Sequence, residues 1–204
     1  MGVSFHAAGL AYEDSYDCGC TTYGGYRMAL ANAIDSEFGI LYRAWYTNVG
    51  VEEKNDSLSF RSFMFADTEE EIEAIRSLPP VNVQYVDRNF LALGRPKDEP
   101  LTGNAAKKYA VAVIVDWDAF CKYTAERISE AAKKLLFASD CEGKWSWREC
   151  RDMYKELSDY KVDTLGHNYG ETISGGNMRS FNMHEQFMGM MRHCWKRRVN
   201  LWWS

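Results

Sequence analysis

Two glycine-rich loops near the end of the chain carry side chains that could bind an anion. In the first loop, His167, Asn168 and Tyr169 stand between Gly166 and Gly170. A histidine, an amide and a phenol flanked by flexible residues can all point into one cleft. The pattern therefore predicts ligand contact, and the alternative is a tight turn with a hydrogen-bonded histidine.

The second glycine-rich loop, 174–177, lies just before Arg179 and the last predicted helix. Exposed backbone amides, a helix N-terminus and a guanidinium are the groups that bind phosphate. The spacing is not that of a Walker loop, which ends in Lys followed by Ser or Thr. A simple connector is the alternative.

The segment 17–27 repeats this combination of glycine, aromatic residues and arginine at the other end of the chain, with Tyr23 and Arg27. Loops from both ends could enclose one nucleotide-sized pocket, in which aromatic faces stack a base while arginine and amides hold phosphate. The alternative is that most of these aromatic side chains are core, as helical spacing indicates for Tyr26. The predicted ligand-binding set is Tyr23, Arg27, His167, Asn168, Tyr169 and Arg179.

The segment 138–149 partly matches a calcium-binding loop. With Gly143 at the sixth position, Asp140, Glu142, Ser146 and Glu149 fall at positions three, five, nine and twelve. The first position lacks a carboxylate and the seventh is a lysine, so tight calcium binding is not expected. The alternative is a turn between two helices whose acids cap the helix ends, with Ser146 and Glu149 forming a capping box.

Other metal and catalytic motifs are absent from the sequence. The histidines, at 6, 167, 184 and 193, are scattered. The cysteines, at 18, 20, 121, 141, 150 and 194, do not have zinc-chelating spacing, so we expect reduced thiols, no zinc and no cofactor. Asp116 and Asp118 could coordinate magnesium after the strand 109–115, although a helix cap explains Asp118 equally well.

The basic run 192–198 and the following Trp202 and Trp203 form the strongest local cationic and aromatic cluster. Such a cluster is typical of contact with nucleic acid or an anionic partner. The alternative is that the cations favour a helix C-terminus and the indoles attach the tail to the body of the protein.

The segment 139–143, the pair Glu149 and Cys150, the loop 166–170 and an amphipathic closing helix that ends at 199–202 together resemble uncharacterised proteins of bacteriophages and their hosts. The resemblance covers roughly residues 135–204. It implies a phage-type accessory protein of the host cytoplasm, and it implies no particular activity.

Length and composition define the general class. The chain has 204 residues, 46% apolar and 26% charged, which excludes a disordered chain. The net charge is −5, because 16 acids and 8 bases in residues 1–100 give −8, while 13 acids and 16 bases in residues 101–204 give +3. Duplex nucleic acid is therefore an improbable partner. No apolar stretch is long enough to span a membrane, so no membrane association is expected.

Periodicity predicts an α+β fold with one mixed β-sheet packed against several helices in a single domain, 1–204. Strands are expected at 3–8, 58–65, 81–86 and 109–115, the last of these central and covered on both faces. Helical segments are expected from 22 to 45 with a break at Gly39, from Asp67 to 78, from 118 to 136, from 146, and from Asn182 to 199. The segment 94–104 is expected to be a mobile loop or a connector.

These features predict a phage-type protein that counteracts host defence by binding and sequestering a small anionic, nucleotide-like signal. One alternative is a protein-binding inhibitor of a host defence nuclease, of the anti-CRISPR or anti-restriction type, whose acidic first half covers a basic surface. A further alternative is a nucleotide-cleaving enzyme. A homo-oligomer is compatible with all three.

The loop residues provide a direct test. If the predicted cleft binds phosphate and a base, Arg179→Ala should weaken ligand binding tenfold or more, and Tyr169→Ala should cost about 1–3 kcal/mol of binding free energy. Melting temperature and ligand binding are measured on the same two variants. Loss of stability without a selective loss of binding would contradict the cleft.

Overall fold

The computed structural model describes residues 2–10, 16–54, 57–66, 68–86, 109–162, 170–172, 178–180 and 182–204. The chain divides into two compact units. The first contains residues 1–39 and 128–204, and the second contains residues 40–127. The predicted loop 94–104 and residues 166–169 lie outside the described residues.

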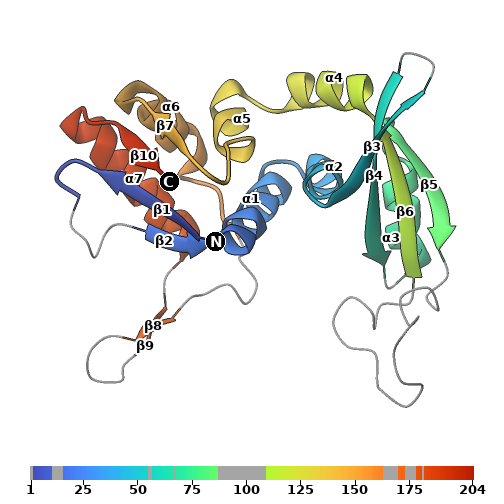
Figure 1. The fold of residues 1–204 in the computed structure, drawn as a ribbon, viewed down its shortest axis with the longest axis horizontal. Helices are drawn as coiled ribbons and strands as arrows, with labels where there is room; N and C mark the ends of the chain where they lie inside the picture. Colours follow the sequence, from blue (N-terminus) through green and yellow to red (C-terminus); the bar gives the residue numbers. More distant parts are fainter. Residues whose placement is uncertain are drawn as a thin grey trace. The chain divides into compact units, whose positions relative to one another are not determined.

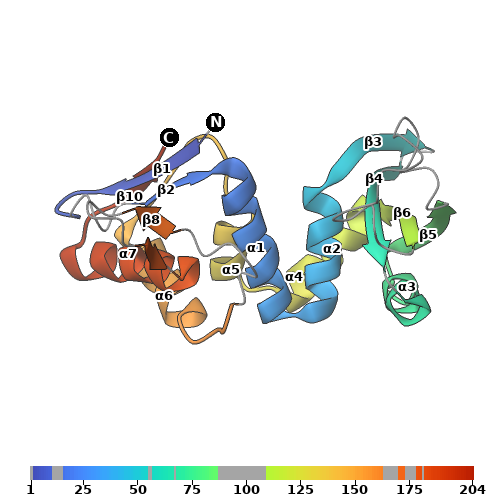
Figure 2. The same ribbon diagram turned by 90° about the horizontal axis from the view of Figure 1, so that it is seen from below.

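The first unit contains a four-stranded antiparallel sheet with its helices on one face. The strand order is β2-β1-β10-β7. Figure 2 shows this sheet on one side of the unit and helices α6 and α7 on the other. The strands are β1 (Gly2–Ala7), β2 (Tyr16–Gly19), β7 (Gly143–Trp145) and β10 (Leu201–Trp203), and a separate hairpin is formed by β8 (Gly170–Thr172) and β9 (Met178–Ser180). The helices are α1 (Cys20–Ile34), α5 (Glu130–Leu136), α6 (Trp147–Leu157) and α7 (Met183–Arg197).

Aromatic rings form the centre of the first unit. The ring of Phe5 lies 5.3 Å from Tyr23 and 4.8 Å from Phe187, in edge-on contacts. The ring of Tyr26 stacks on Phe187 at 4.9 Å. These four side chains are fully buried. Strand β1 and helices α1 and α7 are therefore held together by apolar burial and by favourable ring geometry.

The second unit contains another four-stranded antiparallel sheet, in the order β3-β4-β6-β5. Its strands are β3 (Asn48–Lys54), β4 (Ser57–Ala66), β5 (Val81–Val86) and β6 (Tyr109–Asp116), and its helices include α3 (Glu69–Arg76) and α4 (Trp117–Arg127). Figure 1 shows the strands side by side with α3 behind them. Strands β4 and β5, with α3 between them in sequence, form a β-α-β unit, and β6 lies between the two strands because it pairs antiparallel with both.

The apolar strand β6 lies inside its sheet, as predicted, because it pairs with a strand on each side. One face is fully covered, since Val111, Val113 and Val115 have no exposed surface. On the other face Ile114 is only half-buried. Its direct neighbours there are polar, Arg61 on β4 and Asn82 on β5. The expectation of full coverage on both faces is therefore corrected.

Several element boundaries differ from the expectation. The helical break falls at Asp35, between α1 and α2 (Ser36–Tyr46), and not at Gly39. The side chain of Asp35 accepts a hydrogen bond from the backbone N–H of Phe38, at 2.9 Å, and thereby begins α2. Gly39 lies inside α2, where close packing against α1 leaves no room for a side chain. A Cβ atom there would lie 2.5 Å from the Cα of Asn32.

Five helix caps either correct or confirm the expectation. Thr68 caps α3, and Asp116, not Asp118, accepts a hydrogen bond from the first turn of α4, from Ala119 N at 2.8 Å. The expected single helix over 118–136 is divided into α4 and α5, because Ser129 caps α5. The capping box of Ser146 and Glu149 and the cap formed by Asn182 are confirmed.

The α+β class is confirmed. All described strand pairs are antiparallel, so two antiparallel sheets and a short hairpin replace the one mixed sheet that was expected. The single domain that was expected stays a prediction, because the chain divides into two compact units.

Two helical glycines form a matched pair for testing the packing. In Gly39→Ala the added methyl meets the backbone of Asn32, so we expect a loss of about 1–3 kcal/mol of stability. Gly189, inside α7, has no neighbouring atom within 4 Å of an added Cβ. Gly189→Ala should therefore gain about 0.5–1 kcal/mol through helix propensity. Thermal melting of both variants checks the contrast, and equal shifts would contradict it.

Candidate functional site

The predicted ligand-binding residues are only partly described. His167, Asn168 and Tyr169 lie outside the described residues. Arg179 lies in β9, where its backbone pairs with Glu171 on β8. Tyr23 and Arg27 lie in the core of the first unit, with exposed fractions of 0% and 1%. A ligand role for these six residues stays a prediction.

The buried Arg27 has a structural role. One guanidinium nitrogen donates to the carbonyl oxygens of Leu136, at 3.2 Å, and Ala138, at 2.6 Å. The other donates to the carboxylate of Asp140. The guanidinium also lies 4.3 Å from the ring centre of Tyr23. Arg27 therefore satisfies carbonyls at and beyond the C-terminal end of α5 and fixes the start of the 138–149 loop.

The acids of that loop make structural contacts. Asp140 forms an ion pair with Arg27. Glu149 accepts a hydrogen bond from Lys134, and it also accepts hydrogen bonds from the backbone N–H and the hydroxyl of Ser146. These contacts, led by Lys134, lower the pKa of Glu149 to about 2. The geometry agrees with the interpretation of this segment as a turn whose acids cap and pair.

A buried histidine in the first unit, His184, was not among the site residues predicted from the sequence. His184, 4% exposed, contacts the carbonyl oxygen of Leu157 through Nε2, at 2.9 Å, and the hydroxyl of Tyr26 through Nδ1, at 3.0 Å. Because a carbonyl only accepts, Nε2 carries the proton and Nδ1 accepts from Tyr26. Burial lowers the pKa of His184. His184 is therefore a neutral structural residue that joins α7 to α1 and to the end of α6.

His184 also lines a cavity of about 400 Å³ in the first unit, together with residues 158–162, Asn182 and Glu185. Val162 and Asn182 are the described residues that flank 163–181. The walls of the cavity hold Asp159, Lys161 and Glu185, and both ring nitrogens of His184 are already used. This cavity is therefore a weaker candidate for a ligand-binding site than the cavity of the second unit, which lies between α2, β4 and α3.

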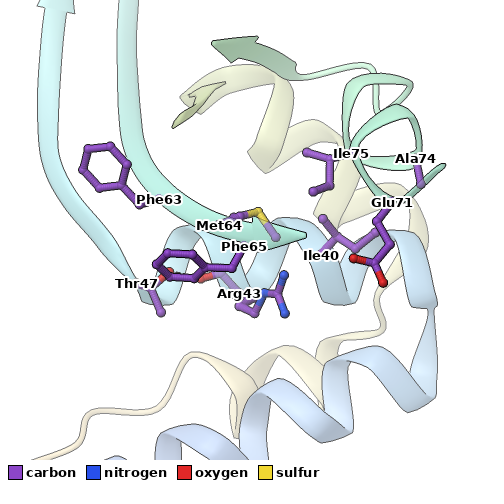
Figure 3. A pocket seen from close by; sticks show the side chains of 9 residues that line it. All are labelled: Ile40, Arg43, Thr47, Phe63, Met64, Phe65, Glu71, Ala74 and Ile75. Atoms are coloured by element: carbon purple, nitrogen blue, oxygen red, sulfur yellow. The ribbon is translucent and has the colours of Figure 1, made fainter. Parts of the chain in front are cut away.

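The second unit contains a cavity of about 440 Å³ between α2, β4 and α3. Figure 3 shows the side chains that surround it. Six of its nine lining residues are apolar, and its polar side chains come from α2, from the residue that follows α2, and from α3. The lining residues are Ile40, Arg43, Thr47, Phe63, Met64, Phe65, Glu71, Ala74 and Ile75. Ligand pockets of small molecules have this size, about 300–1,000 Å³, and this composition.

The helices and the strand position these groups through ordinary local rules. Arg43 is on α2, and Thr47 follows the last residue of that helix, one turn further along the chain. The hydroxyl of Thr47 donates to the carbonyl oxygen of Arg43, at 2.8 Å, and contacts the hydroxyl of Ser62 on β4, at 2.9 Å. On β4, Ser62 and Met64 are buried, while Phe63 and Phe65 alternate with them and are half-buried.

Arg43 is the main charged group of this cavity. Its side chain is exposed at the rim and makes no hydrogen bond or ion pair with another described residue. Desolvation by the surrounding protein lowers the pKa of its guanidinium, and the carboxylate of Glu71 acts in the opposite direction. A partly desolvated cation beside half-buried phenyl rings can bind an anionic group that is attached to a flat apolar body. No local sequence motif marks this site, because its residues come from separate elements.

Comparisons with protein-family models, with curated proteins and with solved structures find no match. In the described part of the chain, no group of three or more His, Cys, Asp or Glu side chains is arranged to hold a metal ion. Among the described helices, none has the length and apolar character needed to cross a bilayer.

The position of Arg27 generates a stability prediction. Arg27→Met leaves the carboxylate of Asp140 and two carbonyls without their donor, so we expect a loss of about 3 kcal/mol of stability. Arg192→Met, at an exposed position of α7, is the control and should change stability by less than about 0.5 kcal/mol. Urea unfolding measures both. Wild-type stability of Arg27→Met would contradict the structural role.

Proposed function

We propose that the protein binds a small anionic, nucleotide-like ligand in the cavity between α2, β4 and α3. The observation that carries this proposal is Arg43, a partly desolvated guanidinium with no hydrogen-bonded acid among the described residues, at the rim of a cavity with six apolar residues among the nine that line it. A charge in such surroundings gains more from an incoming anion than a fully hydrated surface arginine does.

The rest of the cavity fits the remainder of such a ligand. Phe63 and Phe65 offer aromatic surface for a base, and Ile40 and Ile75 add apolar wall. Glu71 lies close enough to interact electrostatically with Arg43. The phosphate is thus assigned to Arg43 and the base to the phenyl rings.

The ligand class is the one expected from the sequence, while the site is a different one. Sequestration of such a ligand as a host-defence signal remains part of the proposal. It is supported by the resemblance of residues 135–204 to phage and host proteins. Sequestration requires only that the site bind the ligand, without any catalytic group.

A protein-binding inhibitor is the second candidate, and the hairpin of β3 and β4 favours it. Val49, Val51 and Leu58 are 62%, 64% and 43% exposed on this hairpin. Glu52 and Glu53 lie between them in sequence. Exposed apolar residues beside acids suit a basic partner surface. Replacing the three apolar residues by serine should abolish inhibition of a host defence while Arg43→Ala retains it, if this candidate is correct.

Binding variants test the proposed ligand site. With a panel of mononucleotides and cyclic dinucleotides, Arg43→Ala should weaken binding by roughly 10- to 150-fold, the equivalent of about 1.5–3 kcal/mol. Glu71→Gln should strengthen binding of an anion roughly two- to fivefold, because it removes a negative charge near the phosphate. Arg76→Ala, which removes an exposed cation on α3 that is paired with Glu73, is the control and should change little.

Calorimetry gives the affinities, and chromatography of the recovered ligand shows whether it is intact. Recovery of a cleaved nucleotide would favour the enzyme alternative. Equal affinities of Arg43→Ala and the wild type, or no binding by any member of the panel, would overturn the proposal.

A further inference from the structure

The outer face of the sheet in the first unit carries an exposed indole between two basic side chains. Trp202, on β10, is directly opposite His6 on β1 and Lys144 on β7. Directly opposed residues of antiparallel strands point to the same face. The rings of Trp202 and His6 lie 4.5 Å apart, with planes 30° from parallel. Trp202 is 47% exposed, and Lys144 is exposed.

The exposure of Trp202 follows from the alternation of the strand. Its neighbours Leu201 and Trp203 point inward and are 0% and 5% exposed. The described helices α6 and α7 lie on that inner side, as Figure 2 shows. Trp203 therefore attaches the end of the chain to the core, whereas Trp202 is not needed for that packing. A large aromatic side chain in the open, on an interior strand of a sheet, is available for stacking with a partner.

A second cluster of aromatic and basic side chains adjoins this row. The guanidinium groups of Arg148 and Arg198 lie 4.5 Å and 5.9 Å from the ring centre of Trp147. The side chain of Asn200, two residues before Trp202, accepts a hydrogen bond from the backbone N–H of Trp147, at 3.3 Å. Asn200 thus joins Trp147, at the start of α6, to the residue that precedes β10.

The charge on this surface selects an anionic partner. Lys144 is an exposed cation of the sheet face, and Arg148 and Arg198 are exposed cations of the Trp147 cluster. They lie around two indoles, and no acid is among the residues directly opposite Trp202. An aromatic ring standing on a sheet can stack with an unpaired base, whereas the bases of a duplex are already stacked on each other. The combination therefore fits a single strand with its bases turned toward the protein.

We propose that this surface binds single-stranded nucleic acid, with Trp202 stacking on a base and Lys144, Arg148 and Arg198 contacting the backbone phosphates. The site is separate from the cavity of the second unit and does not depend on the small-ligand function. It also assigns different roles to the two C-terminal indoles.

The probes are fluorescein-labelled 12-nucleotide strands, dT12 and U12, whose binding to the full chain is followed by fluorescence anisotropy at 50 mM salt. Both strands should bind, and the ratio of their affinities shows whether DNA or RNA is preferred. Trp202→Ala should weaken binding at least fivefold, and Trp202→Phe should restore most of it, since stacking tolerates any aromatic ring. Lys144→Ala and Arg148→Ala should each weaken binding and reduce the slope of log K against log salt by about 0.7.

Lys122→Ala, at an exposed position of α4 in the second unit, is the matched control and should leave affinity unchanged within a factor of two. Circular dichroism melting confirms that each variant is folded. Binding of dT12 and U12 no tighter than that of a 12-bp duplex or of poly-glutamate would identify a general cationic surface and overturn the proposal. Wild-type affinity of Trp202→Ala, or no detectable binding of either strand, would also overturn it.

Discussion

The first unit depends on the burial of one positive charge. A guanidinium removed from water must be matched by acceptors, because an unpaired buried charge costs several kcal/mol. Arg27 meets this constraint with the carbonyls of Leu136 and Ala138 and the carboxylate of Asp140. The three acceptors belong to the end of α5 and the segment after it, so satisfying the charge also determines where that segment lies relative to α1.

The consequences extend to the C-terminus. Between the acceptors lies Ser139, whose carbonyl oxygen accepts a hydrogen bond from the indole of Trp203, at 3.0 Å. The ring of Trp203 lies 4.3 Å from Trp145 and 5.8 Å from Phe5. The last strand is thereby held between β1 and β7. Since inward and outward side chains alternate along a strand, the inward position of Trp203 places Trp202 on the outer face.

The cavity of the second unit depends on different contacts. Alternation along β4 buries Ser62 and Met64 and leaves Phe63 and Phe65 half-buried, and residues 63–65 all line the cavity. Arg43 is brought there by α2, whose end is held to β4 by the contact between Thr47 and Ser62. The acidic first half of the chain thus has a cation, Arg43, at its cavity. The basic second half has an exposed cation, Lys144, on its sheet. Net charge alone would not have located either surface.

The sequence by itself determined the features that depend on near neighbours. The capping box of Ser146 and Glu149, the cap at Asn182, the interior strand β6 and the α+β class all follow from side chains within a few residues or from simple periodicity. Caps and periodicity are local, so they remain valid whatever the rest of the chain does. The break at Asp35 and the division of α4 from α5 are also local, but competing helical signals on both sides obscured them.

Only the tertiary structure decided the roles of the charged and aromatic side chains. Arg27 fits a phosphate-binding loop as a pattern, yet its acceptors lie 109–113 residues away in the chain. Trp202 and Trp203 are adjacent in sequence and differ because His6, Lys144 and the core lie on opposite faces of one strand. Arg43 lines a cavity because β4 and α3 supply the other walls. Long-range pairing determines whether a polar group is satisfied or available, and no local pattern contains that information.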